Sequence, residues 1–429
     1  MKLVFYSKLN KENKKKLLKR KAIDLRKTTQ VCKKIISDVH SRGDEALRYY
    51  SKKFDSINLE KFKISNAEVE KAYSELDLEI KKSIKFAYKN IYKFHFAQKF
   101  NKLNVQTRPG VYCSIEVRPF DRVGIYIPGG SAPLVSTALM LGIPAQISGC
   151  SEIIAVSPPN KYGKLSAEVI YALSLCGIKN IYKIGGAQAI AALAFGTEEV
   201  PKVDKIFGPG NQFVTTAKML VANFINGPAI DLPAGPTEVL IIADKFANPR
   251  FIAADLLAQA EHNTDSQCVF VSNNYSLVLK VKEELKAQIK SLPRKDIIKK
   301  VLKNSFILIV KDLKEAIKYS NEYAPEHLVL NIQNYKRLTK YISSAGSVFL
   351  GRYSAEASGD YASGTNHTLP TYGYARSYSG VNLSSYYRFI TFQRITEEGN
   401  RLLMPYVGSI ARAEGLEAHA RSLEIRSLK

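Results

Sequence analysis

The segment VGIYIPGGSAPLVSTALMLGIPAQISGCSEIIAVSPP, residues 123–159, decides the fold class of this 429-residue chain. It has the pattern of an apolar strand, a glycine turn, an apolar helix and a second strand. The alternation continues to residue 224 and resumes from EVLIIAD at 238–244 to GSVFLG at 346–351. Such repeats predict parallel sheets with helices on their faces. We therefore expect an α/β protein with two Rossmann-like units, divided near AIDLPAGPTE at 229–238.

The two ends of the chain depart from this alternation. Apolar residues recur at intervals of three and four in residues 31–54 and 65–98, which predicts a helical N-terminal region. The stretch from residue 382 onward is polar and is also expected to be helical. The expected divisions are an N-terminal arm at 1–20, a first α/β domain at 21–122 and 243–381, a second α/β domain at 123–242, and a helical tail at 382–429.

Composition excludes several classes of protein. Hydrophobic residues make up 45% of the chain, as in globular proteins, and no apolar stretch approaches the roughly 18 residues of a membrane span. The five cysteines are scattered without a CxxC motif, which fits a reducing, cytoplasmic compartment. A net charge of +24 would suit nucleic acid, but the lysines are spread along the chain without a zinc-finger or RNP-type motif. We expect neither a nucleic-acid partner nor a membrane segment.

Three strand ends carry glycine pairs, in IYIPGGSAP (125–133), KIGGAQAI (183–190) and IFGPGNQF (206–213). Glycine at a strand-to-helix turn allows a ligand to approach the backbone, and the helix that follows offers free N–H groups to phosphate. None of the three is a complete GxGxxG motif. Each alone could be a tight turn. Together, at one edge of a parallel sheet, they favour a nucleotide-type cofactor.

Three histidines lie near polar side chains that could bind a metal. The pairs are Gln259 with His262 in ADLLAQAEH, Asp360 with His367 in the glycine- and serine-rich SAEASGDYASGTNHTLP, and Glu414 with His419 in AEGLEAHA. Gln259 and His262 would share one face of a helix. The composition around Asp360 and His367 indicates a loop, and the spacing of Glu414 and His419 would place both near one face of a helix. Carboxylate, imidazole and amide ligands would suit zinc. The same residues could equally be hydrogen-bonded surface or core side chains, and no HExxH motif is present.

The segment NEYAPEHLVL, residues 321–330, places Glu326 and His327 at the start of an apolar strand. A neutral imidazole, with a pKa of about 6.5, can accept a proton, and a carboxylate can orient water. Because successive residues point in different directions, we expect two separate functions rather than a hydrogen bond between them. The alternative is a capping glutamate and a packed histidine.

Several long motifs coincide with those of one family. They are GGAQAIAALAFGTEEVPKVDKIFGPGN, IDLPAGPTEVLIIAD, QAEHNTDSQ, NEYAPEHL and GSVFLGRYSAEASGDYASGTNHTLPTYGYA. From about residue 20 to the C-terminus the chain resembles the histidinol dehydrogenases. The resemblance implies oxidation of L-histidinol to L-histidine through L-histidinaldehyde with two NAD⁺, the last two steps of histidine biosynthesis. It also implies one zinc ion per site and a homodimer.

The resemblance implies a role for each candidate residue. The implied zinc ligands are Gln259, His262, Asp360 and His419, the last donated by the partner subunit, so that sites are shared across a swapped dimer. Glu326 and His327 would be the acid–base residues, and the implied NAD⁺ contacts are Tyr126, Gln188 and Asn211. The substrate would meet the zinc ligands, His327, Thr237, His367 and Glu414. Thr237 stands where the family commonly has serine, so that a hydroxyl is retained and a methyl group is added. A zinc-dependent hydrolase of a small amide or ester is the alternative, but it would leave the glycine turns without a function.

Overall fold

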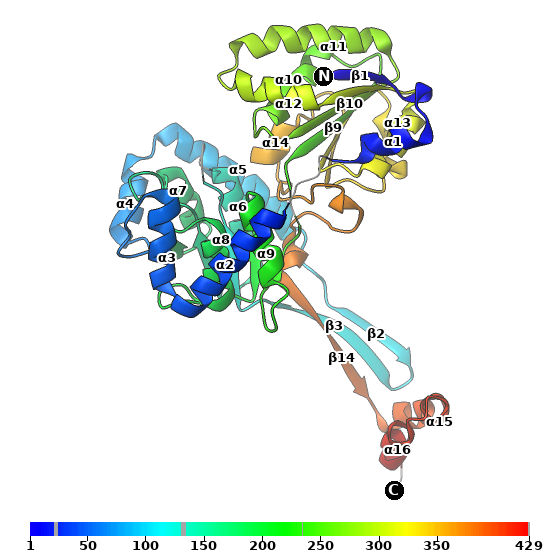
Figure 1. Cartoon of the computed structure of the whole chain (residues 1–429). Coiled ribbons are helices and arrows are strands. Elements are labelled where there is room, and N and C mark those ends of the chain that lie inside the picture. Colours follow the sequence, from blue (N-terminus) through cyan, green and yellow to red (C-terminus); the bar gives the residue numbers. More distant parts are fainter. Residues whose placement is uncertain (21–24, 130–133, 234, 428–429) are drawn as a thin grey trace.

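The computed structural model describes residues 1–20, 25–129, 134–233 and 235–427. Its strands form three sheets, of which sheets A and B are parallel and sheet C is antiparallel. Figure 1 shows two lobes side by side, with sheet C extending away from them as an arm. The predicted α/β class with two parallel-sheet units is confirmed.

The first lobe contains sheet A, with strand order β1-β11-β10-β9-β12-β13. These strands are β1 (Lys2–Phe5), β9 (Glu238–Ala243), β10 (Gln267–Ser272), β11 (Phe306–Ile309), β12 (His327–Asn331) and β13 (Ser347–Leu350). One face packs against α10 (Pro249–Ala260), α11 (Tyr275–Gln288) and α12 (Lys295–Asn304), and the other against α13 (Leu313–Tyr323) and α1 (Lys11–Leu18). Successive residues of β9 alternate between the two hydrophobic cores, so both faces of the sheet are covered.

The second lobe contains sheet B, with strand order β6-β5-β4-β7-β8. Its strands are β4 (Arg122–Tyr126), β5 (Glu152–Val156), β6 (Asn180–Tyr182), β7 (Lys205–Phe207) and β8 (Ala229–Ile230). One face is covered by α4 (Asn66–Glu75), α5 (Leu78–Phe96), α6 (Val135–Ser148) and α7 (Ala167–Leu175). The other is covered by α2 (Arg26–Arg42), α3 (Asp44–Tyr50), α8 (Gly186–Phe195) and α9 (Gln212–Val221).

The packing of the N-terminal helices corrects the expected domain boundaries. Helix α2 packs on α8 and α9, α4 on α7, and α5 on α6, so these helices belong to the lobe of sheet B and not with residues 243–381. Residues 1–20 supply strand β1 and helix α1 to sheet A, and β9 joins the same sheet although residues 238–242 were expected in the other domain. The apolar face of a helix predicts burial, but it does not identify the sheet that the helix covers.

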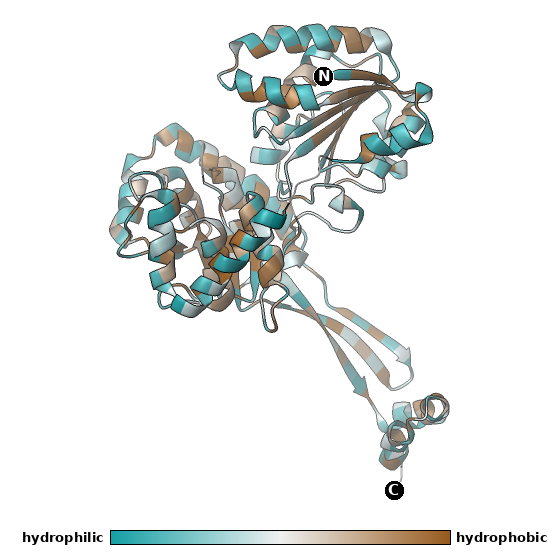
Figure 2. Ribbon diagram, viewed as in Figure 1, coloured by the Kyte–Doolittle hydropathy of each residue, from teal (hydrophilic) through white to brown (hydrophobic). Residues whose placement is uncertain are grey.

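The arm consists of β2 (Leu103–Arg108), β3 (Val111–Pro119) and β14 (Tyr387–Ile395), with β3 in the centre. It leads to α15 (Glu397–Ala413) and α16 (Glu417–Glu424), which lie at its far end in Figure 1. The expectation of a helical tail is therefore wrong for β14. In Figure 2 brown residues fill the strands of sheet A beneath the helices, whereas on the arm brown and teal residues mix, and Phe389, Ile390 and Phe392 are exposed.

The remaining elements are short. They are η1 (Tyr6–Lys8), η2 (Ser51–Asp55), η3 (Ile289–Ser291), η4 (Tyr335–Arg337), η5 (Thr339–Tyr341), α14 (Glu356–Tyr361), η6 (Tyr374–Arg376), η7 (Leu383–Tyr386) and η8 (Ile425–Ser427). None of the described helices is long and apolar enough to cross a membrane.

Candidate active site

The candidate residues gather where opposite ends of the two parallel sheets meet. His327 is the first residue of β12 and Glu238 the first of β9, so sheet A presents the amino ends of its strands. Tyr126 is the last residue of β4 and Gly208 follows β7, so sheet B presents its carboxyl ends. A cavity of about 90 Å³ lies between the two ends, and its lining includes Gly208, Pro209, Thr237, Glu326 and His367.

His327 is buried among three carboxylates. Its Nδ1 lies 3.6 Å from Glu326 and 3.4 Å from Glu356, and its Nε2 lies 3.5 Å from Asp360. Burial lowers the pKa of the imidazole, but the three negative charges outweigh burial and raise it to about 10. Nδ1 also lies 3.3 Å from the backbone oxygen of Glu238, whereas the buried Nε2 has no hydrogen-bond partner among the described residues. This nitrogen faces the Asp360 carboxylate, which is one of the three charges that raise the pKa of the imidazole.

Glu326 is held by the strand beside it. Its Oε2 accepts hydrogen bonds from the Thr237 hydroxyl at 2.6 Å and from the backbone N–H of Glu238 at 2.8 Å. Burial raises the pKa of Glu326 to about 7, although His327 and these two donors oppose the increase. The 3.6 Å separation from His327 agrees with the expectation that the two side chains do not hydrogen-bond to each other.

The first twenty residues reach the back of this site through Arg20. Its guanidinium donates Nε to Glu238 Oε2 at 2.9 Å and Nη2 to Glu238 Oε1 at 2.7 Å. It also stacks 3.5 Å above the Tyr323 ring and donates to the backbone oxygen of Ala324 at 3.3 Å. Ala324 has a φ of 51°, a left-handed conformation, two residues before Glu326. Arg20 therefore stabilises the turn at Ala324 that precedes Glu326 and His327.

One of the predicted metal ligands, Asp360 on α14, belongs to a compact group of polar side chains that does not include His262. Helices α10 and α14 are in contact, and one group of described side chains, His327, Glu356 and Asp360, has possible ligand atoms within 4.8 Å of one another. Asp360 and Glu356 are four residues apart on α14, which corrects the loop expected for residues 356–361, whereas His367 lies in irregular structure as expected. Their spacing puts both carboxylates on one face of the helix, toward His327. Glu356 was not predicted from the sequence, although its place four residues before Asp360 was visible there.

Gln259 and His262 complete this side of the site. Gln259 is fully buried, and its side-chain oxygen faces the Glu356 carboxylate unless the amide is reversed. The Thr237 hydroxyl gives its single hydrogen to Glu326, so it accepts from the Gln259 amide nitrogen at 2.8 Å, and a protonated Glu356, whose pKa is raised by burial to about 8, donates to the amide oxygen. His262 lies just beyond α10, where loss of hydration around the imidazole lowers its pKa and the Asp360 carboxylate opposes this change.

His367 connects the two lobes. Its Nδ1 lies 2.9 Å from the backbone oxygen of Asp360, and its Nε2 lies 3.1 Å from the hydroxyl of Thr137 on α6. Because a carbonyl oxygen only accepts, Nδ1 carries the hydrogen and Nε2 accepts from Thr137. Burial lowers the pKa of His367, which agrees with this neutral form. Thr137 had no signal in the sequence, since only the fold brings α6 to this loop.

The predicted cofactor contacts line one larger cavity of about 940 Å³. Tyr126 accepts a hydrogen bond from the backbone N–H of Gly186 at 3.2 Å, and Gln188 is buried on the following helix. The side-chain oxygen of Asn211 caps α9 by accepting from Phe213 and Val214, which leaves its amide nitrogen for a ligand. At Gly208, with a φ of 119°, an added Cβ would lie 2.2 Å from the backbone oxygen of Tyr126. Residues 130–133 of the first glycine turn lie outside the described residues.

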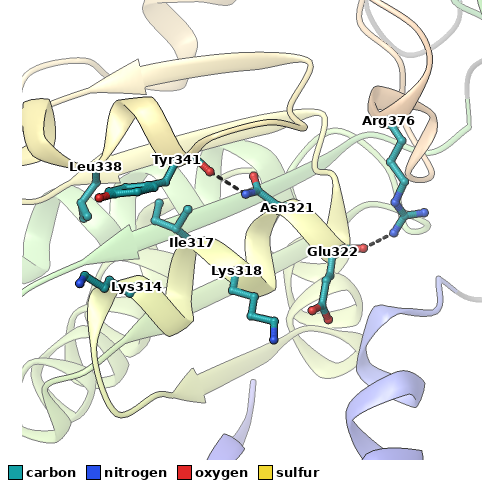
Figure 3. A pocket seen from close by; sticks show the side chains of 8 residues that line it. All are labelled: Lys314, Ile317, Lys318, Asn321, Glu322, Leu338, Tyr341 and Arg376. Carbon is teal, nitrogen blue, oxygen red and sulfur yellow. Dashed lines mark hydrogen bonds between the residues drawn. The ribbon is translucent and has the colours of Figure 1, made fainter.

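A third cavity, of about 550 Å³, lies on the outer side of α13 (Figure 3). Figure 3 shows Lys314, Ile317 and Lys318 along that helix, with Tyr341 and Arg376 opposite. None of the predicted site residues lines this cavity, so it is separate from the candidate active site.

Comparison with known proteins agrees with this arrangement. The family model described as histidinol dehydrogenase matches residues 18–427. A histidinol dehydrogenase from Photobacterium profundum is 48% identical over 99% of this chain and 96% of its own length.

The chain belongs to the histidinol dehydrogenase family.

Two further members of the histidinol dehydrogenase family extend the comparison. The Arabidopsis thaliana protein named "Histidinol dehydrogenase, chloroplastic" is 48% identical over 99% of this chain and 91% of its own length. The crystal structure of histidinol dehydrogenase from Elizabethkingia anophelis is 47% identical and has a TM-score of 0.95 over 99% of this chain and 98% of that one. The similarity therefore includes the arm and the tail as well as both lobes.

The tail places its two candidate residues away from the cavity in this single chain. Glu414 ends α15 and His419 lies in α16, and both are exposed. The turn at Gly415, with a φ of 75°, separates them, which corrects the expectation of a shared helical face. In Figure 1 both helices lie at the far end of the arm. The chain therefore does not bring His419 to its own Gln259, His262 and Asp360.

Proposed function

We propose that this chain oxidises L-histidinol to L-histidine through L-histidinaldehyde, with reduction of two NAD⁺. The observation that carries the proposal is the position of Glu326, which lines a cavity shared with the glycine turn at Gly208 and lies 3.6 Å from Nδ1 of His327. Membership of the histidinol dehydrogenase family supports the substrate and the cofactor. A hydrolase would use the same polar cluster but would have no use for the 940 Å³ cavity at the glycine turns.

The donor set around His327 fits a zinc ion. Gln259, His262 and Asp360 would hold it, because zinc takes oxygen and nitrogen ligands, and Asp360 belongs to the group of His327, Glu356 and Asp360 whose possible ligand atoms lie within 4.8 Å of one another. A zinc ion held there would supply a Lewis-acidic centre that orients the substrate beside His327 and Glu326. A cation beside Glu356 and Asp360 would oppose the effect by which these carboxylates raise the pKa of His327.

The proton transfers follow from the positions of the two side chains. The backbone oxygen of Glu238 lies 3.3 Å from Nδ1 of His327, which leaves Nε2 to accept the hydroxyl proton while hydride passes from C1 to nicotinamide. Glu326, with its pKa raised to about 7, then activates water on the aldehyde. His327 accepts a proton from the hydrate as the second hydride leaves for a new NAD⁺. His327 would thus deprotonate the alcohol, and Glu326 would activate the water.

The substrate would also meet Thr237, His367 and Glu414. The Thr237 hydroxyl already donates to Glu326, so its main effect is to orient that carboxylate, and its extra methyl group narrows the cavity beside it. His367 is neutral and fixed between the lobes, so it would orient the substrate rather than move protons. Glu414 would reach the substrate only from a partner chain.

We propose that the working form is a homodimer in which α16 of each chain completes the site of the other. The arm supports this proposal, since it carries His419 away from its own lobes and exposes apolar residues on β14. Dimers mixed from two different variant subunits test this exchange of helix α16. His327→Asn and His419→Asn subunits are each inactive alone, but a mixed dimer has one site with an intact His327 and an intact tail from its partner, so activity returns. Mixtures that stay inactive would refute the exchange.

The activity is tested by spectrophotometry with zinc, NAD⁺ and histidinol. Two NADH formed for each histidine support the proposal, whereas one NADH would indicate that the reaction stops at the aldehyde. Release of acid from a small ester without NADH formation would favour the hydrolase. We place the reaction in the cytoplasm, in keeping with five free cysteines.

A further inference from the structure

The cofactor cavity contains one carboxylate that the proposed reaction does not use. Asp55 is the last residue of η2 and lines the 940 Å³ cavity together with Phe54, Tyr126, Gln188 and Asn211. It is the one acidic residue among the described lining residues, and it comes from the N-terminal helical region rather than from a strand end of sheet B.

One oxygen of the Asp55 carboxylate has no partner in the described part of the chain. This atom, Oδ2, is buried and makes no hydrogen bond there. Burial raises the pKa of the group, and desolvation is its one resolved cause among the described residues. A buried carboxylate oxygen without a donor is unfavourable, and it becomes satisfied when a ligand supplies one.

No acidic residue stands at the usual position for this role in the chain. In dinucleotide-binding sheets an Asp or Glu about 20 residues beyond the glycine turn binds the ribose hydroxyl of NAD⁺. In this chain the strand at that distance is β5, which is followed by Ser157, Pro158, Pro159 and Asn160. All four residues line the cavity, and none is acidic. Asp55 lines the same cavity from η2, which is not part of the sheet.

The position of Asp55 identifies the half of the cofactor that it meets. Hydride transfer requires nicotinamide near His327, so this end must lie toward the smaller cavity at Gly208 and Glu326. Asp55, with Val31 and Ile35 of α2, lines the larger cavity and not the smaller one. The adenosine half is the part left for Asp55.

We propose that Asp55 accepts hydrogen bonds from the adenosine ribose hydroxyls and thereby selects NAD⁺ over its 2′-phosphorylated form. This inference rests on the proposed function, since it assumes that the cavity holds a dinucleotide. A 2′-phosphate would place negative charge against the carboxylate and remove the hydroxyl donor. Lys161 and Lys164 also line the cavity, but both are exposed and would meet the pyrophosphate from the rim.

The test compares Asp55→Asn with wild type and with Glu60→Gln. Glu60 is exposed on the same segment and is absent from the cavity lining, so this control changes the net charge equally. Initial rates are measured with NAD⁺ and with NADP⁺ at saturating histidinol. In Asp55→Asn the KM for NAD⁺ should rise about tenfold with kcat retained, because a hydrogen bond to a charged group is lost from binding alone. The preference for NAD⁺ over NADP⁺ should fall at least as much, and Glu60→Gln should alter neither by more than about twofold.

Direct binding separates this inference from the reaction itself. NADH and NADPH are titrated against the wild-type protein by fluorescence, and NADH should bind at least about tenfold more tightly. Equal binding of the two, or an unchanged preference in Asp55→Asn, would overturn the role of Asp55 even if histidinol is oxidised. Tight, selective NADH binding without histidinol oxidation would support Asp55 and refute the proposed function instead.

Discussion

Replacement of Arg20 by methionine should destabilise the lobe of sheet A. The change removes both hydrogen bonds to Glu238 and leaves that carboxylate buried without a counter-charge, since the two side chains are 7% and 1% exposed. Loss of one partner from a buried ion pair costs about 3–5 kcal/mol. For a lobe of this size such a loss lowers the unfolding temperature by about 6–20 °C. Arg20→Lys should be intermediate, because lysine keeps the charge but loses the two-pronged contact and the stacking on Tyr323.

Thermal and urea unfolding measure this effect, and a double-mutant cycle separates the pair from its surroundings. Arg20→Met combined with Glu238→Gln should be less destabilising than the sum of the two single changes, because no unpaired charge remains. Arg42→Met is the matched control. Arg42 makes the same two-pronged contact with Asp38 at 2.7 and 2.6 Å, but these two side chains are 34% and 23% exposed, so that water screens the pair and the loss of stability should be much smaller than at Arg20. Equal effects of the two arginine substitutions, or full additivity in the cycle, would refute the reasoning.

Three further predictions concern the candidate site. His327→Asn should abolish both oxidations, whereas Glu326→Gln should spare histidinol oxidation relative to histidinaldehyde oxidation; equal losses in separately assayed half-reactions would contradict the division of roles. His262→Asn should lose bound zinc by elemental analysis, and a full equivalent retained would remove this residue from the ligands. In zinc-free protein the His327 pKa of about 10 exceeds its unfolded value of about 6.5, so its stabilising contribution is full below pH 6.5 and is lost as pH rises through 10. The unfolding temperature should therefore fall more steeply from pH 7 to 10 in wild type than in His327→Asn.

The periodicity of apolar residues along the sequence predicted the strands and helices whose burial follows a regular spacing. The alternation after residue 123 gave sheet B, and the PEHL segment was correctly placed at the start of a buried strand, now β12. Strand β14 was missed because its partner, β3, lies at the other end of the chain, and its exposed aromatic residues have no helical or buried pattern. Long-range pairing of this kind leaves no local signal.

The site shows the same limit. Gln259 and His262 could be paired by helical spacing, but Glu356 entered the group only when α14 turned its face toward His327. Parallel sheets usually bind ligands at the carboxyl ends of their strands. Sheet A instead presents the amino ends of β9 and β12, because the two lobes face each other in opposite senses, and no single strand encodes that orientation.

The pairing of strand β1 has a consequence for the order in which the two lobes can fold during synthesis. Lys2 pairs with Phe306, so the first strand to leave the ribosome waits while the chain grows to β11. At about 5–20 residues per second this interval lasts roughly 15–60 s. Every strand of sheet B is made within it, since β8 ends at Ile230. All strands of sheet B thus exist while sheet A still lacks an edge, but Tyr386, which stacks on Phe207 in the core of the same lobe, is made only after β11. A nascent chain halted near residue 300 would therefore lack both this core residue and the pair Glu326 and His327.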